Sequence, residues 1–412
     1  MVLTACTSTR VHKVKREIQI ELENEQLSNQ FTGLLLVDSE TKDTIIAKNS
    51  NKYFIPASTA KLFTFYTANK LLGKKLPSLK YFESTDSLYI QGTGDPSWFH
   101  PYFKDSTVLS FLRNTTKPIV LYLNNFEDEK FRPGWAWEDY QYYFSPELGP
   151  MPLYGNVVTI QEKSKLNVSP NDFIRYIKRG KPDKLRELYK NEFTIPQVLK
   201  DTLQIPFITS NELTKSLLQQ KLKKEIFLSK KPHNKTYEVL HGIATDSIYK
   251  RMLYESDNFL AEQMMLVASS TLSDTLSFDI AKDYVLEKYL SDLKQEPRWV
   301  DGSGLSRYNL FTPESMVSLL HKLYSELDRQ RLFTILPAWD SNGTIKSLNS
   351  TTNHFIFAKS GSMGNTYNLC GYLKTKTGKT FIFSFMNNHF RIPSKEVRIQ
   401  IEKTLKLIYD AY

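Results

Sequence analysis

The stretch that decides the fold is YFIPASTAKLFTFYTANKLLG, Tyr53 to Gly73, which places a serine and a lysine at the start of an apolar helix. Pro56 is typical of a helix start, and Gly73 is typical of a helix end. Apolar residues recur every three or four positions, and Ser58 and Lys61 fall on the same face as these residues. A lysine is an unfavourable choice for a buried face, so the pattern indicates that its amine has a task there.

A serine and a lysine one helical turn apart can act as a nucleophile and its base. The N–H of a serine in a first helical turn favours negative charge on an attacked carbonyl oxygen. A lysine that is partly desolvated by Phe65 and its neighbours has a lowered pKa and can take the serine proton. The alternative is a structural lysine that extends past core residues to water. The S-x-x-K pattern does not decide between them, because it begins also at Ser39, Ser247 and Ser291.

A second motif lies in RMLYESDNFLAEQMM. Ser256, Asp257 and Asn258 stand there between two helical patterns, in a connection where polar side chains can point into a cleft. Taken alone, S-D-N could be an ordinary cap of the helix that begins near Phe259.

A third motif, K-S-G at 359–361, ends an apolar strand pattern, and a hairpin pattern follows it. K-T-G at 376–378 lies between two strand patterns, NLCGYLKT and TFIFSFMNN, and is therefore predicted to be a hairpin turn. Lys359 is the better candidate, since Gly361 at the end of its strand lets a ligand backbone approach closely.

The order S-x-x-K, S-D-N, K-S-G is the signature of penicillin-recognising serine acyl-transferases. The chain resembles the low-molecular-mass class C penicillin-binding proteins, the D-alanyl-D-alanine carboxypeptidase/endopeptidase family. The resemblance runs from about Phe31 to Phe390 and departs from the family in Ser360, where threonine is usual, in the threonine of GTGDP and in PMPLYGN. It includes four further stretches: GTGDPSW from Gly92, RPGWAWEDYQYYFSP from Arg132, DGSGLSRYNLFTP from Asp301, and SNGTIKS before the Lys359 strand.

The resemblance implies catalytic roles for five residues. Ser58 attacks the carbonyl of a D-Ala-D-Ala or cross-bridge peptide, and Lys61 takes its proton. Ser256 relays a proton to the leaving amine, while Asn258 binds the substrate amide and helps to hold Lys61. Lys359 supplies positive potential for the terminal carboxylate of the substrate.

The resemblance also implies a substrate-binding set beside these residues. Ser360 keeps the hydroxyl that the family uses for the carboxylate, and the N–H groups of Ser58 and Ser362 form the oxyanion hole. Gly361 and Asp257 complete the substrate-binding set. Peptidoglycan peptides and β-lactams are the implied partners.

The implied fold class is α+β, a penicillin-binding core of the serine β-lactamase/transpeptidase type. Residues 25–80 and 236–412 are expected to form this core, with an antiparallel sheet that helices flank. SKEVRIQIEKTLKLIYDAY is predicted to be a helix that covers the sheet. Almost half of the chain separates Ser58 from Ser256, so an inserted, mostly β region is expected at residues 81–235.

Composition limits the other partners. The formal charge of +10 and the pI near 9.2 suggest attraction to polyanions. The lysines are scattered along the chain, however, and this favours solvated faces over a nucleic-acid site. The basic stretch 170–190 is interpreted as a solvated helix, with contact to an anionic wall polymer as the alternative. The histidines form no H-x-x-x-H pair and no phosphate loop occurs, so we expect no metal and no cofactor. The oligomeric state is not specified.

The N-terminal sequence LTAC, ending at Cys6, resembles a lipobox, and residues 1–24 then form a polar tether. Met1–Leu3 is too short for a signal peptide, so either an upstream signal is missing or the match is chance. A lipid anchor at Cys6 is the expected membrane attachment, in a periplasmic, cell-envelope location, since no apolar run is long enough to span a bilayer.

Two rival functions share the motifs. A class A β-lactamase requires a carboxylate base, commonly in E-x-x-L-N, and Glu287 begins EKYLS, which lacks the asparagine. A non-hydrolytic sensor or scaffold of the envelope would keep the fold without turnover, but degenerate motifs would be expected there and these motifs are intact.

Overall fold

The computed structural model describes residues 15–23, 29–339 and 355–412, which divide into two compact units. Unit 1 comprises residues up to 66, 249–257 and 286–412, and unit 2 comprises 67–248 and 258–285. Three helices have residues in both units: α2 (Lys61–Leu71), α5 (Thr245–Tyr254) and α7 (Phe278–Tyr289). Unit 2 thus takes in the helix that follows S-D-N, which we expected in the core.

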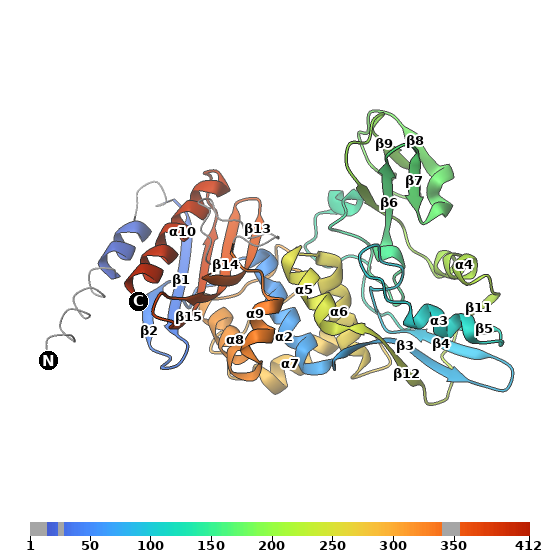
Figure 1. Ribbon diagram of the computed structural model, residues 1–412, viewed down its shortest axis with the longest axis horizontal. Coiled ribbons are helices and arrows are strands. Elements are labelled where there is room, and N and C mark those ends of the chain that lie inside the picture. Colours follow the sequence, from blue (N-terminus) through green and yellow to red (C-terminus); the bar gives the residue numbers. More distant parts are fainter. Residues whose placement is uncertain (1–14, 24–28, 340–354) are drawn as a thin grey trace. The chain divides into compact units, whose positions relative to one another are not determined.

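Unit 1 is built on one antiparallel sheet, whose strand order is β13-β14-β15-β1-β2 (Figure 1). The N-terminal and C-terminal parts of the chain meet there, because β1 pairs with β15 along its whole length. The elements are β1 (Phe31–Asp38), β2 (Thr44–Lys48), the 3-10 helix η2 (Ala57–Ala60), α8 (Pro313–Glu326), α9 (Arg329–Ile335), β13 (Ile356–Met363), β14 (Thr366–Lys374), β15 (Thr380–Asn388) and α10 (Ser394–Ala411).

Helices cover both faces of this sheet. Helix α10 packs on β14, and its apolar residues share a core with Leu34 and Leu36 of β1. Helix α8 packs on β1 and β15 from the other face. Four residues of α10 at helical spacing are almost fully buried, as the sequence predicts: Val397, Ile401, Leu405 and Ile408.

A short helix at residues 15–22 also packs in unit 1, beside α10 (Figure 1). Its Ile18 and Leu22 are buried in the same core as α10. The amide of Gln400 donates to the carbonyl of Glu21 at 2.9 Å. This part of the expected tether is therefore helical and attached to the sheet core, while Cys6 lies outside the described residues.

Unit 2 contains a five-stranded mixed sheet of order β11-β5-β4-β3-β12, a three-stranded sheet β10-β6-β7 and the pair β8-β9. Strands β6 to β9 gather at one end of the unit, away from β3, β4 and β5 (Figure 1). The elements are β3 (Lys75–Glu83), β4 (Leu88–Gly92), α3 (Thr107–Asn114), β5 (Ile119–Tyr122), η3 (Trp137–Gln141), η4 (Tyr154–Asn156), β6 (Val157–Glu162), β7 (Leu166–Ser169), η5 (Asn171–Tyr176), β8 (Ile177–Arg179), β9 (Phe193–Ile195), β10 (Leu203–Pro206), α4 (Asn211–Leu222), β11 (Ile226–Ser229), β12 (Glu238–Ala244) and α6 (Asn258–Ser270).

The basic stretch 170–190 is not the helix that we predicted. It forms the short 3-10 helix η5, then strand β8, then irregular chain. Gly180 and Pro182 interrupt the helical pattern, and Phe173 is buried against Phe193 of β9. The two helix-breaking residues and the packing of Phe173, Ile177 and Leu185 into the core of unit 2 together outweigh the helical periodicity.

Candidate active site

The nucleophile candidate Ser58 lies in η2, one turn before the first residue of α2. Lys61 begins α2, and its Nζ donates to Ser58 Oγ at 3.0 Å. Lys61 is fully buried, whereas Ser58 is half-buried. A serine hydroxyl that is partly open to solvent and bonded to a buried amine has the geometry of a nucleophile beside its proton acceptor.

The buried lysine is held by a distant loop. Its Nζ also donates to the Ser303 carbonyl at 2.6 Å, and one turn later Thr64 Oγ1 donates to the Gly302 carbonyl at 2.6 Å. These two carbonyls belong to the D-G-S-G segment that begins at Asp301. The loop therefore fixes the amine that faces Ser58.

Asp301 shapes this loop from inside. Its carboxylate is buried and accepts from the N–H of Gly304 at 2.7 Å, from the N–H of Ser306 at 2.6 Å and from Asn309 Nδ2 at 2.7 Å. Several donors on one carboxylate give a rigid turn. Arg307 of the same loop is exposed.

The backbone around the nucleophile is unusually crowded. Ala57, immediately before Ser58, has φ +45°, a left-handed conformation that costs a residue with a Cβ about 1–2 kcal/mol. Gly304 has φ +79°, and a Cβ there would lie 1.9 Å from the Ala57 carbonyl oxygen. Only glycine permits the loop to approach the nucleophile turn this closely.

Strand β13 carries K-S-G along the same turn. A Cβ on Gly361 would lie 2.5 Å from the Pro56 carbonyl oxygen and 2.9 Å from the Ser58 nitrogen. The backbone of β13 thus passes directly beside the N–H of the nucleophile. Ser362 is the next residue and is exposed, and Ser360 is buried.

Lys359 is fully buried on β13, and its Nζ donates to the Ser360 carbonyl at 2.7 Å. Burial, and secondly the charge of Lys61, lower the pKa of Lys359 well below the usual value for lysine. Two neighbouring ammonium groups repel each other, so a state in which only one of the two amines carries a proton is favoured. An arriving carboxylate would raise the Lys359 pKa again.

The S-D-N segment connects α5 to α6. Ser256 has φ +56° and is half-buried, and Asp257 lies 3.6 Å from Arg251 Nε. All three of these residues belong to unit 1. Asn258 begins α6 in unit 2, where its Nδ2 donates to the Phe144 carbonyl at 3.0 Å.

The structure also separates the decoy motifs from the site residues. Ser247 and Lys250, a second S-x-x-K, are both exposed on α5. Lys376 and Thr377 lie in the turn between β14 and β15, as predicted, and Lys376 pairs with Asp410 at 2.5 Å. The SNGTIKS stretch lies outside the described residues.

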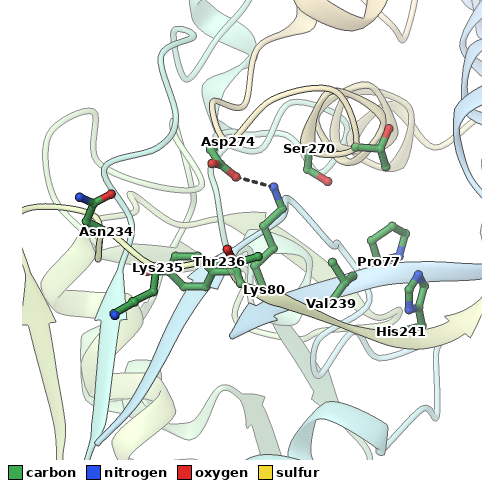
Figure 2. A pocket seen from close by; sticks show the side chains of 11 residues that line it. Pro77, Lys80, Asn234, Lys235, Thr236, Val239, His241, Ser270 and Asp274 are labelled. Carbon is green, nitrogen blue, oxygen red and sulfur yellow. Dashed lines mark hydrogen bonds and ion pairs between the residues drawn. The ribbon is translucent and has the colours of Figure 1, made fainter. Parts of the chain in front are cut away.

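A hollow of about 800 Å³ in unit 2 contains none of the motif residues. Its wall combines residues of β3, of β12 and of the end of α6 (Figure 2). Lys80 there is already paired with Asp274 at 2.8 Å, and Ser270 donates to the Val267 carbonyl within its own helix. Neither side chain is arranged as a base or nucleophile, so Ser58 remains the candidate nucleophile.

In the described residues, no group of three or more His, Cys, Asp and Glu side chains is placed to hold a metal ion. In the same residues, no helix combines the length and the apolar character that crossing a bilayer requires.

The sequence pattern of the D-Ala-D-Ala carboxypeptidase 3 (S13) family matches residues 14–179 and 202–408. The chain belongs to this family. The resemblance that three motifs indicated is confirmed, and with it the prediction of a serine-type D-Ala-D-Ala carboxypeptidase of the low-molecular-mass class C penicillin-binding group.

The S13 relatives span nearly the whole chain. A D-alanyl-D-alanine carboxypeptidase, DacB of Haemophilus influenzae, is 23% identical over 90% of this chain and 90% of its own length. The crystal structure of penicillin binding protein 4 from Haemophilus influenzae is 19% identical, with a TM-score of 0.76 over 95% of this chain and 99% of that one. A predatory peptidoglycan endopeptidase from Bdellovibrio bacteriovorus is 15% identical, with a TM-score of 0.53 over 92% and 93%. These structural likenesses confirm the predicted fold class.

Proposed function

We propose that this protein cleaves D-alanyl-D-alanine peptides of peptidoglycan through an acyl-enzyme on Ser58, and that β-lactams acylate the same serine. The observation that carries the proposal is the 3.0 Å hydrogen bond from Lys61 to Ser58 on a turn that β13 borders. Family membership supplies the substrate class. A crystal structure of the Haemophilus penicillin binding protein 4 contains a β-lactam, which supports the second part.

In acylation, Ser58 Oγ forms a bond to the peptide carbonyl carbon while its proton passes to Lys61. The carbonyl oxygen gains a negative charge, which the N–H groups of Ser58 and Ser362 stabilise. The tetrahedral adduct then loses its amine, and Ser256 relays the proton that this amine takes up. Asn258 binds the substrate amide.

On the substrate side, Lys359 and Ser360 bind the terminal carboxylate, with Asp257 and Gly361 completing the pocket. The lowered pKa of Lys359 makes this binding proton-linked, because a carboxylate stabilises the ammonium form. Water then attacks the acyl-enzyme and releases the shortened peptide, and Ser58 recovers its proton.

A β-lactamase is a poorer description of this site. Glu287, the glutamate nearest to the required pattern, is exposed on α7. Opened β-lactams should therefore remain on Ser58 for longer than one catalytic cycle on peptide.

We also propose a periplasmic location with a lipid anchor at Cys6, which precedes the helix at residues 15–22 that packs in the core of unit 1. We assign the functional core to residues within 25–80 and 236–412 and the insertion to 81–235, while unit 2 groups 67–80, 236–248 and 258–285 with that insertion. Expression with the native upstream sequence, followed by intact mass, tests the anchor: a diacylglyceryl mass on Cys6 supports it, and an unmodified thiol removes it.

The central test is intact mass before and after exposure to a penicillin. The wild type should gain one covalent adduct, Ser58→Ala should gain none, and Ser247→Ala, in the exposed decoy motif, should behave as the wild type. The absence of an adduct on folded wild type would overturn the nucleophile assignment and would favour a non-hydrolytic sensor.

The substrate bond needs a second assay. Release of D-alanine from a muramyl pentapeptide would establish carboxypeptidase activity, and cleavage of a cross-linked muropeptide dimer would establish endopeptidase activity. We expect Ser58→Ala to abolish both.

A further inference from the structure

Two buried asparagines of unit 1 stand behind the nucleophile turn, and no motif includes them. Asn368 lies on β14, and Asn388 is the last residue of β15. Their side chains are 0% and 1% exposed. A fully buried amide needs partners for both its oxygen and its nitrogen, so the identity of those partners indicates what the residue does.

Asn368 bonds to the segment that leads into Ser58. Its Nδ2 donates to the Ile55 carbonyl at 2.9 Å and to the Pro56 carbonyl at 2.8 Å. Its Oδ1 accepts from the N–H of Asn387 at 3.0 Å, which fixes the orientation of the amide. The side chain thus spans from the central sheet to the two residues before the nucleophile turn.

Asn388 bonds to the same segment from the next strand. Its Oδ1 accepts from the N–H of Ile55 at 2.7 Å, and its Nδ2 donates to the Ile55 carbonyl at 3.2 Å. Both backbone polar groups of Ile55 are therefore satisfied by asparagine side chains rather than by a strand or helix. The side-chain amides of Asn368 and Asn388 thus attach residues 55 and 56 to the sheet.

The Pro56 carbonyl connects this arrangement to K-S-G. Asn368 pairs directly with Gly361 in the β13–β14 ladder, so the two residues face the same side of the sheet. The Pro56 oxygen, which would lie 2.5 Å from a Cβ on Gly361, is the oxygen that Asn368 binds. Thr59 Oγ1 also donates to that oxygen, at 2.8 Å.

From this geometry we infer that Asn368 is a positioning residue for acylation, a role that rests on the proposed function. Asn368 holds the Pro56 carbonyl over Gly361 and so sets the distance between the Ser58 N–H and the β13 backbone. The two N–H groups of the proposed oxyanion hole belong to these two segments. The bonds of Asn368 go to Ile55, Pro56 and Asn387, so its effect on Ser58 acts through the turn.

A purely structural role would give a different pattern of kinetics. Loss of a stabilising amide would lower the melting temperature without changing the acylation rate of the protein that remains folded. Loss of positioning lowers the rate constant for acylation, k2, while the dissociation constant of the initial complex, Ks, stays constant, because the oxyanion forms only during reaction.

Asn387 offers a matched control on the neighbouring position of β15. It is as buried as Asn368, but its Oδ1 accepts from Thr32 at 3.0 Å and Gln30 at 3.1 Å, on the side away from residues 55 and 56. Its bond to Asn368 uses the backbone N–H, which Asn387→Ala keeps.

The experiment compares Asn368→Ala and Asn387→Ala in the full chain. The readouts are k2 and Ks for a fluorescent penicillin, together with the melting temperature. We expect both variants to melt earlier, and only Asn368→Ala to lose k2, by about 10- to 100-fold, with Ks unchanged. Asn368→Asp keeps the shape of the side chain but replaces the amide nitrogen, which donates to two carbonyls, with an oxygen that can only accept. We expect this variant to lose at least as much of k2. It replaces the alanine variant if that variant does not fold.

Equal k2 in Asn368→Ala and Asn387→Ala would overturn the positioning role, and so would an unchanged k2 in Asn368→Asp. The same measurement separates this outcome from failure of the proposed function. If the fluorescent penicillin does not label the wild type, the proposed acyl-enzyme on Ser58 is wrong. If it labels the wild type and the Asn368 variants at the same rate, only the positioning role of Asn368 is wrong.

Discussion

At Gly361, strand β13 lies in close contact with the turn that carries Ser58. A methyl group there would meet the Pro56 carbonyl oxygen at 2.5 Å and the Ser58 nitrogen at 2.9 Å, both of them backbone atoms that cannot rotate aside. We expect Gly361→Ala to push the strand from the turn and to slow acylation by about 100-fold. Stopped-flow labelling with a fluorescent penicillin measures this rate.

Gly73 provides the control for that substitution. No atom lies within 4 Å of a Cβ built on it. Gly73→Ala should therefore acylate at the wild-type rate. Wild-type acylation by Gly361→Ala would mean that the close approach is dispensable.

Lys359 gives the unfolding free energy a dependence on pH. Its pKa in the folded protein is well below the unfolded-chain value of about 10.4, because it is buried and faces the charge of Lys61. Between these two pKa values the unfolded chain binds more protons than the folded chain, so stability rises with pH across that range. Lys359→Met, of similar length, should remove this contribution.

Urea unfolding of both proteins at several pH values from neutral to about 10 measures the difference. Titratable groups that both proteins contain contribute equally to the two pH curves, so their contributions cancel in the difference. The wild type should gain stability relative to Lys359→Met by up to about 1.4 kcal/mol per pH unit. Parallel pH curves would show that Lys359 keeps an ordinary pKa in the folded state.

The Ser58–Lys61 bond could be predicted at the residue scale, because a spacing of three across one helical turn places the two side chains on one face, although Ser58 lies in η2 and Lys61 begins α2. The second partner of Lys61, the Ser303 carbonyl, could not be predicted in this way. The position of that carbonyl depends on the turn that the Asp301 carboxylate stabilises, and this turn is distant from Lys61 in the sequence. Asn368 was missed for the same reason, since an asparagine in a strand pattern carries no signal of its partners.

At the element scale, the helix at residues 15–22 has one buried and one exposed isoleucine. Ile18 is 1% exposed within the core that α10 lines, and Ile20 is 59% exposed. Ile18→Ala should lower the unfolding free energy by about 2–5 kcal/mol. Ile20→Ala should change it by less than about 0.5 kcal/mol. Chemical denaturation of the two variants tests whether this helix belongs to the core, and equal effects would contradict it.

Periodicity predicts elements well where one face is buried. The short apolar run after Phe31 and the three- and four-residue spacing from Val397 correspond to β1 and α10. The same reasoning failed at 170–190, where isolated apolar residues pack against strands of unit 2 rather than along one helix face. It also did not anticipate the helix at 15–22, because three apolar residues among four charged ones fit a solvated tether equally well.

At the scale of the whole molecule, the chain passes between the two units several times. Unit 1 is made from three segments and unit 2 from two. Each change of unit at 66/67, 248/249 and 285/286 falls inside a helix rather than in a linker. Sequence patterns locate linkers by composition, so a boundary inside a helix leaves no trace in the sequence.

These shared helices predict that the two units unfold together. Helix formation is cooperative along its length, so α2, α5 and α7 couple loss of structure in one unit to loss in the other. Ile18→Ala perturbs unit 1. Glu262→Ala perturbs unit 2, because it removes the 3.2 Å bond to the buried Arg132 and leaves that guanidinium paired with Asp128, at a cost of about 1–3 kcal/mol. Calorimetry should record one transition for the wild type, and each variant should lower its midpoint. Two transitions, each moved by only one of the variants, would instead mean that the units unfold independently despite the helices that they share.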